Sequence, residues 1–209
     1  MTFDSIVFDL DGTLWDTTNA CVTAWNSVVA RLGVEFRTIV SEDVRAVTGK
    51  PHDECIRVTF QGVPEEQVLA LIEETATEDV AVIARDGGTL YDGVPEGLAV
   101  LAQTYRLFIV SNCQAGYIET FLSLSGLGHL FEDVECFGNT GQPKGENLRR
   151  LIERNWLLSP LMVGDAEGDE TAARLCGVPF AFMSYGFGGC TAPDYRFDSF
   201  ASLLSATLT

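Results

Sequence analysis

The apolar positions of this chain fall into short runs that alternate with longer amphipathic stretches. Each run has the length and the β-branched or aromatic content of a buried strand, and the stretches between most of them place apolar residues at helical spacing. Strands that alternate with helices of about ten to fifteen residues predict a parallel sheet. The predicted strands cover residues 5–10, 106–111, 134–138, 161–165 and 179–185, and the helices between them cover 95–105, 116–124 and 144–156.

Residues 17 to 83 differ, because they show helical periodicity and no convincing strand. We expect one helix capped by Asn19, a second capped by Ser41, a third over 53–60 and a long fourth that starts at Pro64. The predicted fold class is α/β, with a doubly wound, Rossmann-like parallel sheet as its core. Residues 1–16 and 84–209 form this core domain, and residues 17–83 form an inserted α-helical cap domain that covers the site as a lid.

Two carboxylates stand at the end of the first predicted strand. Asp9 and Asp11 follow the apolar run 6–8, and Gly12 marks the turn that ends it. In an open α/β sheet, ligands bind at the carboxyl ends of the strands. Crowded carboxylates are unfavourable unless a cation or a shared proton relieves them, and hard oxygen ligands favour Mg²⁺. The sequence therefore predicts a Mg²⁺ site at this edge of the sheet.

The chain is strongly acidic, since 13 Lys and Arg against 30 Asp and Glu give a net charge of −17. Nucleic acids and anionic membranes require basic surfaces, so neither is expected as a partner. No apolar run approaches the roughly 18 residues of a membrane helix, and a strand that starts near residue 5 leaves no room for a signal peptide. We expect a cytoplasmic monomer or homodimer that binds any anionic substrate through a local positive site.

The cysteines and histidines do not predict a zinc centre. The six cysteines include no Cys-x-x-Cys pair, and His52 and His129 are the two histidines of the chain. Most of the cysteines have apolar neighbours and are interpreted as small buried residues. Cys113 follows a predicted strand end, but core packing is the favoured interpretation there as well.

Further polar residues follow the other predicted strands. Ser111 and Asn112 end the second strand, Lys144 opens a helix, and Asp165 ends the fourth strand with Asp169 four residues later. Each has a structural alternative: the first two can cap a helix, the lysine can be solvated, and the last aspartate can favour a helix N-terminus. An Asp-x-Asp pair alone is weak evidence, whereas four such pieces in this order are much more specific.

This set of motifs resembles the haloacid dehalogenase-like hydrolase superfamily. Within it, the chain is similar to the branch of phosphoglycolate phosphatases and β-phosphoglucomutase-like enzymes, which carry a helical cap after the first motif. The resemblance extends over nearly the whole chain, and it includes the position of the cap and the Tyr-x-Gly-Val stretch at 91–94, which re-enters the core. The resemblance implies Mg²⁺-dependent hydrolysis of a small phosphorylated metabolite through an aspartyl-phosphate.

The resemblance also implies roles for the residues at the strand ends. Asp9 would be the nucleophile, and Asp11 would be the general acid that protonates the leaving alcohol and later activates water. Mg²⁺ would be held by the Asp9 side chain, the Asp11 backbone carbonyl and the Asp165 side chain. The Ser111 hydroxyl and the Asn112 backbone amide would donate hydrogen bonds to the phosphoryl group, and Lys144 would neutralise the charge of the nucleophile and the phosphoryl group. Asp169 would orient either Lys144 or a metal-bound water.

The cap is expected to determine the substrate, and here the sequence is less specific. Basic side chains cluster around the Gly49 turn, and in the family this turn contributes a specificity loop. Lys50 and His52 are therefore predicted substrate contacts, although a solvated position is an equally good interpretation of each; Arg45 and Arg57 are weaker candidates. The glycine-containing stretch 185–189 is interpreted either as a turn or as a substrate contact.

Related reactions remain as alternatives. Mutases resembling β-phosphoglucomutase carry a histidine where this chain has Cys21, and a lysine and an arginine where it has Thr48 and His52. Both departures favour hydrolysis over phosphoryl transfer between sugar positions. Phosphonate-cleaving relatives use a cap lysine, but Lys50 lies closer to the turn glycine than their pattern requires. The Asp11-Gly12 pair is the phosphatase version of the motif and disfavours dehalogenation.

A non-catalytic binding protein on the same fold is the alternative from another functional class, because a fold does not by itself fix a function. Such a lineage would be expected to lose the catalytic carboxylates or the lysine, and this chain keeps them all. Hydrolysis of a small phosphomonoester is therefore the predicted function.

Overall fold

A six-stranded parallel sheet forms the centre of the molecule. The computed structural model describes residues 3–208, and its sheet has the strand order β5-β4-β1-β6-β7-β8 with every neighbouring pair parallel. The α/β prediction is thereby confirmed. The strands, in chain order, are β1 (Ser5–Phe8), β4 (Arg106–Ser111), β5 (Phe131–Cys136), β6 (Pro160–Gly164), β7 (Phe180–Met183) and β8 (Tyr195–Phe197).

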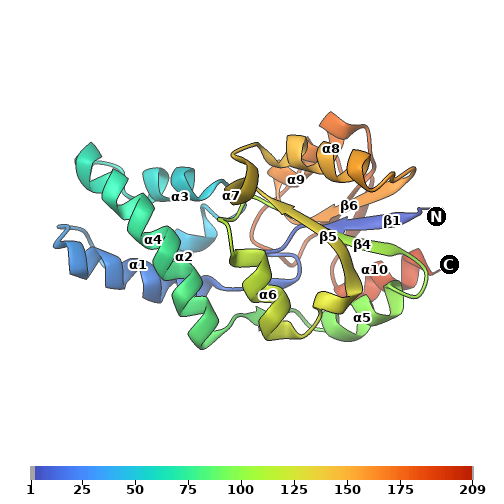
Figure 1. The fold of residues 1–209 in the computed structure, drawn as a ribbon, viewed down its shortest axis with the longest axis horizontal. Helices are drawn as coiled ribbons and strands as arrows, with labels where there is room; N and C mark the ends of the chain where they lie inside the picture. The colour runs from blue at the N-terminus through green and yellow to red at the C-terminus, as the bar shows by residue number, and fades with distance from the viewer. Residues whose placement is uncertain (1–2, 209) are drawn as a thin grey trace.

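Helices cover both faces of this sheet, as a doubly wound fold requires (Figure 1). The helices α8 (Lys144–Arg154) and α9 (Glu167–Cys176) lie on one face, and α5 (Val94–Leu101), α6 (Tyr117–Ser125) and α10 (Phe200–Thr207) lie on the other. Alternate residues of β1 face the two layers: Val7 packs with the α8 and α9 residues, whereas Ile6 and Phe8 pack with the opposite cluster. The nearly continuous apolar strands of the sequence are the consequence of this burial on both faces.

Four helices follow the first strand and extend to one side of the sheet (Figure 1). They are α1 (Thr18–Leu32), α2 (Ser41–Arg45), α3 (His52–Thr59) and α4 (Glu65–Asp86), and a two-stranded antiparallel ribbon of β2 (Trp15–Asp16) and β3 (Thr89–Leu90) connects them to the core. Buried apolar residues such as Trp25 of α1 and Leu71 of α4 pack them together. No helix within residues 3–208 is long and apolar enough to cross a membrane.

Several predicted boundaries were wrong, and the reasons are local. The first strand ends at Phe8 rather than at residue 10, the third covers 131–136 rather than 134–138, and residues Phe137–Thr140 form the short helix α7. The helix predicted to reach Trp156 ends at Arg154, because Trp156 has a positive φ of 55° and its side chain is exposed.

The predicted helix caps were also wrong. α1 begins at Thr18, before Asn19, and the Asp16 carboxylate accepts a hydrogen bond from the Thr18 backbone N–H at 2.8 Å. Ser41 lies inside α2, where Asp43 accepts a hydrogen bond from the Val40 N–H. The sequence pattern did not predict the ribbon β2–β3, the edge strand β8, helix α10 or the short helices α7 and η1 (Gly128–Leu130).

The six cysteines are free thiols. Cys21, Cys55, Cys113 and Cys136 are buried, whereas Cys176 and Cys190 are half-buried. The interpretation of Cys113 as a buried residue is confirmed.

Candidate active site

Three neighbouring strands end at one place on the sheet. In the order β4-β1-β6, Ser111 is the last residue of β4, Asp9 directly follows β1, and Asp165 directly follows β6. The register pairs Phe8 with Ile109 on one side and with Val163 on the other, so Asp9 lies one residue beyond this level and Ser111 and Asp165 lie two residues beyond it. The carboxyl edge of the sheet thus brings together side chains that are far apart in the sequence, as the motif order predicted.

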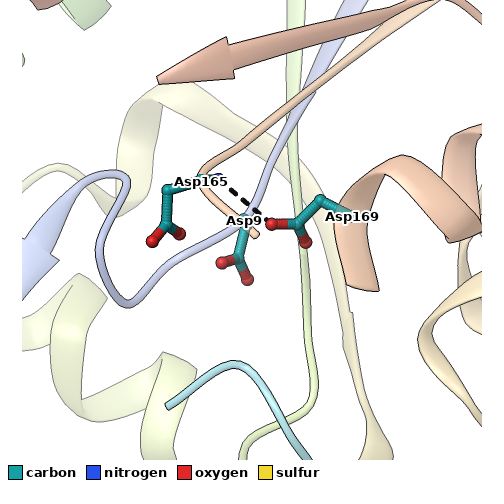
Figure 2. Close-up of side chains that lie close together, drawn as sticks. All are labelled: Asp9, Asp165 and Asp169. Carbon is teal, nitrogen blue, oxygen red and sulfur yellow. Dashed lines mark hydrogen bonds between the residues drawn. The ribbon is translucent and has the colours of Figure 1, made fainter. Parts of the chain in front are cut away.

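The acidic side chains Asp9, Asp165 and Asp169 form a buried cluster at this edge (Figure 2). One ligand atom from each lies within 4.8 Å of the others. Burial, followed by the negative charge of Asp169, raises the pKa of Asp9 well above its ordinary value. Burial and the same neighbour raise the pKa of Asp165 to about 6. Burial and the neighbouring negative charges therefore both disfavour the ionised form of these carboxyl groups.

Lys144 lies within this cluster. Its Nζ donates to Asp9 Oδ1 at 2.6 Å and to Asp169 Oδ1 at 2.7 Å, and its side chain is almost fully buried at the start of α8. Burial alone would lower the pKa of Lys144, but the charges of Asp169 and Asp9 hold it above its ordinary value. The alternative of a solvated lysine is therefore wrong, and the ammonium group is fixed beside Asp9.

Asp169 orients both the lysine and the neighbouring loop. While Oδ1 accepts from Lys144, Oδ2 accepts from the backbone N–H groups of Asp165 at 3.1 Å and Ala166 at 3.0 Å, and Figure 2 shows the first of these bonds. Gly164 permits this approach, since a Cβ there would come within 2.3 Å of Asp169 Oδ2. Asp169 thus also has the structural role at the start of α9 that the sequence left open.

Asp165 is held in a cradle of backbone atoms. Its Oδ2 accepts from the N–H groups of Phe187 at 2.7 Å and Gly188 at 3.2 Å, and its Oδ1 accepts from the Thr13 hydroxyl at 3.2 Å. Gly12 and Gly186 leave room for this carboxylate: an added Cβ would lie 2.4 Å from Oδ2 at Gly12 and 2.3 Å from the Asp165 Cβ at Gly186. The stretch 185–189 therefore supports an acidic residue of the site, a role that the sequence did not indicate.

The donor set of this edge fits a divalent cation. The acidic cluster supplies three carboxylates, and the ammonium group of Lys144 offsets one of their charges. Excess negative charge of this kind in a buried site is relieved by a cation, and oxygen ligands of this hardness suit Mg²⁺. Both oxygens of Asp165 and of Asp169 accept hydrogen bonds, whereas Lys144 uses only Oδ1 of Asp9, so among the described residues Asp9 Oδ2 is the carboxylate oxygen of the cluster best placed to bind the ion.

Asp11 is apart from the acidic cluster and has a different environment. Its Oδ1 accepts from the hydroxyl groups of Tyr117 at 2.7 Å and Thr17 at 3.1 Å. Burial raises the pKa of Asp11 to about 6, although these two hydrogen bonds lower it in part. A carboxyl group with a pKa near neutrality can give and take a proton under ordinary conditions.

A cavity of about 70 Å³ lies between the strand ends and the four-helix segment. The core contributes the proposed catalytic residues Asp9, Asp11 and Ser111, and the helical segment contributes Lys50 and His52. Both predicted cap residues therefore reach the cavity. Lys144 lines an adjoining groove that shares Asn112, Gly49 and Lys50 with the cavity.

The basic residues of the cap have partners of their own. Lys50 Nζ lies 2.7 Å from Glu54, and about half of its side chain is exposed. His52 Nε2 lies 2.9 Å from the Thr75 hydroxyl, and burial lowers the pKa of His52 to about 4. The weaker candidates make ion pairs elsewhere, Arg45 with Asp16 and Arg57 with Glu65.

Ser111 and Asn112 make local contacts as well as lining the cavity. The Ser111 hydroxyl accepts from the Cys113 N–H at 3.2 Å, but α6 begins at Tyr117 with Gly116 as its N-cap, so the alternative that Ser111 or Asn112 caps a helix is wrong. Asn112 Nδ2 donates to the Gly49 carbonyl at 2.8 Å and so joins the sheet edge to the four-helix segment.

Sequence reasoning missed four residues of the site. Tyr117 and Thr17 hold Asp11, while Asp79 and Gln114 line the same cavity. Tyr117 occupies an apolar helix face, so its pattern indicates a core residue. Asp79 did carry a signal: it follows Thr75 by four residues on the buried face of α4, where a solvated acid is unexpected.

Comparisons with known proteins show the family of the chain. The family model of the haloacid dehalogenase-like hydrolases matches residues 6–183. The chain is 31% identical to the plasmid-encoded phosphoglycolate phosphatase of Cupriavidus necator over 90% of this chain and 84% of that protein. It is 28% identical to the phosphoglycolate phosphatase of Vibrio parahaemolyticus over 95% of this chain and 93% of that protein.

A solved structure shows the same fold. The crystal structure of a predicted phosphoglycolate phosphatase from Haemophilus somnus superposes with a TM-score of 0.86 at 24% identity, and the match covers 99% of both chains. At this identity the likeness concerns the fold alone, whereas the family match rests on the sequence. The chain therefore belongs to the haloacid dehalogenase-like hydrolase family, and it is a phosphatase within that family.

Proposed function

We propose that this phosphatase hydrolyses a small phosphomonoester with Mg²⁺ and with Asp9 as the nucleophile. The observation that carries the proposal is the position of Asp9: it lies 2.6 Å from Lys144 Nζ, in the acidic cluster, at the carboxyl edge of the sheet. A carboxylate can attack a phosphate only if their mutual repulsion is neutralised. The lysine and a metal in the acidic cluster provide this neutralisation.

The reaction follows from the two kinds of carboxyl group at the site. An Asp9 oxygen attacks phosphorus as the bond to the alcohol oxygen breaks, and protonated Asp11 gives its proton to that oxygen. Ionised Asp11 then takes a proton from water, the water oxygen attacks phosphorus, and the bond to Asp9 breaks to release phosphate. The pKa of Asp11, raised to about 6, supports both proton transfers. Bound Mg²⁺, held by Asp9, Asp165 and the Asp11 backbone carbonyl, supplies charge neutralisation.

Other residues of the edge bind the phosphoryl group in this proposal. The Ser111 hydroxyl and the Asn112 backbone amide donate hydrogen bonds to it, and Lys144 neutralises its charge under the control of Asp169. Lys50 and His52 reach the cavity from the cap and are proposed to contact the substrate.

The mutase alternative is disfavoured by the cavity itself. Cys21, Thr48 and His52, which stand where β-phosphoglucomutase-like enzymes carry basic residues, all line it.

We further propose that α1–α4, approximately residues 17–83, act as a cap domain on a core of 1–16 and 84–209. The ribbon β2–β3 at both ends of this segment and its share of the cavity lining support the division. We expect the enzyme to act in the cytoplasm, as a monomer or homodimer, on a soluble metabolite. Its net charge of −17 supports the expectation that it has no nucleic-acid or membrane partner. Phosphoglycolate appears in the names of several relatives and therefore belongs in the panel of phosphomonoesters to be tested.

The decisive experiment is phosphate release from a panel of small phosphomonoesters, with Mg²⁺ and then with EDTA. We expect release that requires metal, and we expect Asp9→Asn to lower kcat by at least about a thousandfold because it removes the nucleophile. Asp92→Asn, at an exposed position, is the matched control and should keep full activity. Metal-dependent turnover that persists in folded Asp9→Asn protein would contradict the mechanism.

A further inference from the structure

Buried polar atoms without a partner gather in the cavity. Within residues 3–208, six buried side-chain polar atoms have no hydrogen-bond partner. Three of the six, Asp79 Oδ1, Asn112 Oδ1 and Gln114 Nε2, belong to residues that line the cavity above Asp9. Leaving such atoms unpaired is costly, so native structures normally satisfy them with protein, water or a ligand. Their concentration in one cavity indicates a surface built to hydrogen-bond something that enters it.

Asp79 is the carboxyl member of this group. It lies on α4 with its side chain almost fully buried, and one oxygen, Oδ2, is used structurally: it accepts from Trp25 Nε1 at 3.2 Å and lies 3.6 Å from His52 Nδ1. The other oxygen, Oδ1, has no partner at hydrogen-bond distance. Burial raises the pKa of Asp79 to about 7, although the Cys21 thiol and the Gln114 side chain lie close enough to the carboxyl group to lower that pKa in part. The free oxygen is thus an acceptor in the wall that faces the core.

The charge of the lining argues against a second anionic group on the substrate. Among the described residues that line the cavity, Lys50 is the one permanent cation, and Glu54 lies 2.7 Å from its ammonium group. His52 is uncharged near neutral pH because burial lowers its pKa to about 4. A carboxylate there would be repelled by the acceptor oxygens of Asp79 and Asn112, and the unpartnered donor of the group, Gln114 Nε2, is uncharged and would not neutralise it.

We propose that Asp79 is a specificity-determining residue, which with Asn112 selects phosphomonoesters whose small alcohol carries a hydroxyl or an ammonium group and no carboxylate. This inference rests on the proposed function, since it takes the phosphoryl group to lie at Asp9. The leaving alcohol then extends toward α4, where its hydrogen-bond donor meets the unpartnered acceptors. A site built around such acceptors rejects analogues that lack the donor.

Four phosphate esters of similar size test this directly: 2-hydroxyethyl phosphate, 2-aminoethyl phosphate, ethyl phosphate and 2-phosphoglycolate. We expect kcat/KM for at least one of the two donor-bearing esters to exceed that for ethyl phosphate and that for 2-phosphoglycolate by about tenfold or more. The comparison of 2-hydroxyethyl phosphate with 2-aminoethyl phosphate identifies whether the cavity wall prefers a hydroxyl or an ammonium donor. A preference for 2-phosphoglycolate over both donor-bearing esters would overturn the inference.

Two variants of Asp79 distinguish a role in substrate selection from a role in the stability of the fold. Asp79→Leu should lower the kcat/KM ratio of the preferred ester to ethyl phosphate by about tenfold or more, because the acceptor is lost. Asp79→Asn keeps the shape but replaces the ionisable carboxyl group with a neutral amide, so it should raise the ratio of kcat/KM for 2-phosphoglycolate to kcat/KM for ethyl phosphate several-fold. This test does not depend on whether Asp79→Leu folds. Glu66→Gln, exposed on the same helix, should change neither ratio. Unchanged ratios in folded Asp79→Asn would also overturn the inference.

A further substrate keeps the two proposals distinguishable. p-Nitrophenyl phosphate has an activated leaving group and requires little help from the cavity wall. No metal-dependent release from it by the wild type means that the proposed function has failed. Release from it without the expected ratios means that only the role of Asp79 has failed.

Discussion

At the scale of single residues, the two aspartates of the first motif differ because their neighbours differ. Asp9 lies beside Lys144 and the acidic cluster, whereas Asp11 lies beside the hydroxyl groups of Tyr117 and Thr17. Burial raises the pKa of both carboxyl groups, but the ammonium group of Lys144 favours the ionised form of Asp9 that a nucleophile needs, and a pKa of about 6 suits Asp11 as a general acid. These environments support the two proposed roles.

Tyr117→Phe tests this assignment through the pH profile. The Tyr117 hydroxyl donates to Asp11 and lowers its pKa, so its removal raises that pKa. Because protonated Asp11 must serve the leaving alcohol, activity on an alkyl phosphate declines as the pH rises through this pKa. We expect the decline of kcat to move to higher pH in the variant, with about a two- to tenfold gain, relative to the wild type, on the alkaline side of the optimum.

p-Nitrophenyl phosphate is the control substrate for this profile, because its leaving group does not need the proton. Its alkaline profile should be nearly the same in both proteins. A downward shift for the alkyl phosphate, or an equal shift for both substrates, would count against Asp11 as the acid.

Asp79 and His52 make opposite contributions to the pH dependence of stability. Asp79, with its pKa raised from 3.8 to about 7, contributes stability that is present below pH 3.8 and is lost as the pH rises toward 7. His52, with its pKa lowered from 6.5 to about 4, contributes stability that is present above pH 6.5 and is lost as the pH falls toward 4. Between about pH 4 and pH 6.5 the two contributions change in opposite directions and largely cancel.

Asp79→Asn removes the contribution of Asp79 to the pH dependence of stability and leaves that of His52. Between pH 5 and pH 8, the free energy of unfolding of the variant should improve relative to the wild type by about 2–3 kcal/mol. Denaturant unfolding at the two pH values, in EDTA, measures the difference. Parallel stability curves for the two proteins would show that Asp79 is already ionised in the folded state.

At the scale of elements, the loop after β7 acts as a support for Asp165. The N–H groups of Phe187 and Gly188 point to this carboxylate, and Gly186 makes the close approach possible. Outer supports of this kind normally matter to metal affinity almost as much as the ligands themselves. The loop therefore belongs to the site, although it contributes no ligand.

Gly186→Ala should weaken the metal site. A Cβ there would lie 2.3 Å from the Asp165 Cβ, so the loop must move and its two donors move with it. We expect the Mg²⁺ concentration for half-maximal activity to rise by about 10- to 100-fold. Gly189→Ala is the matched control, since nothing lies within 4 Å of a Cβ at that position. If Gly186→Ala and Gly189→Ala needed the same Mg²⁺ concentration for half-maximal activity, the loop would have no role in the metal site.

The same elements show what the sequence could predict. Strands β1, β4 and β6 are buried on both faces, so their apolar runs were recognisable, and the polar residues that follow them had to meet at one edge. The ribbon strands β2 and β3 have two residues each, too few for a periodic pattern. The support of Asp165 by residues 186–188 and the place of Asp79 depend on contacts between distant segments, which periodicity within one segment cannot express.

At the scale of the whole molecule, the cavity is formed where the helical segment meets the sheet edge. Asn112 of the core donates to the Gly49 carbonyl, and Arg45 of α2 lies 5.7 Å from the centre of the Phe187 ring. Phe187 also donates to Asp165 through its backbone, so the helical segment contacts the loop that supports the acidic cluster. One loop therefore contacts both the helical segment and the proposed metal site.

Metal binding should accordingly stabilise the entire fold. A ligand that binds only the folded state at about 100 times its Kd adds about 2.7 kcal/mol, which corresponds to about 5–10 °C in Tm for a chain of this length. We expect this rise with Mg²⁺ relative to EDTA, and we expect Asp165→Asn to abolish it while Asp92→Asn retains it. Because the raised pKa values of Asp9 and Asp165 make binding displace protons, the rise should be larger at pH 8 than at pH 6. If Mg²⁺ raised the Tm of Asp165→Asn as much as that of the wild type, the ion would bind at a site that does not include Asp165.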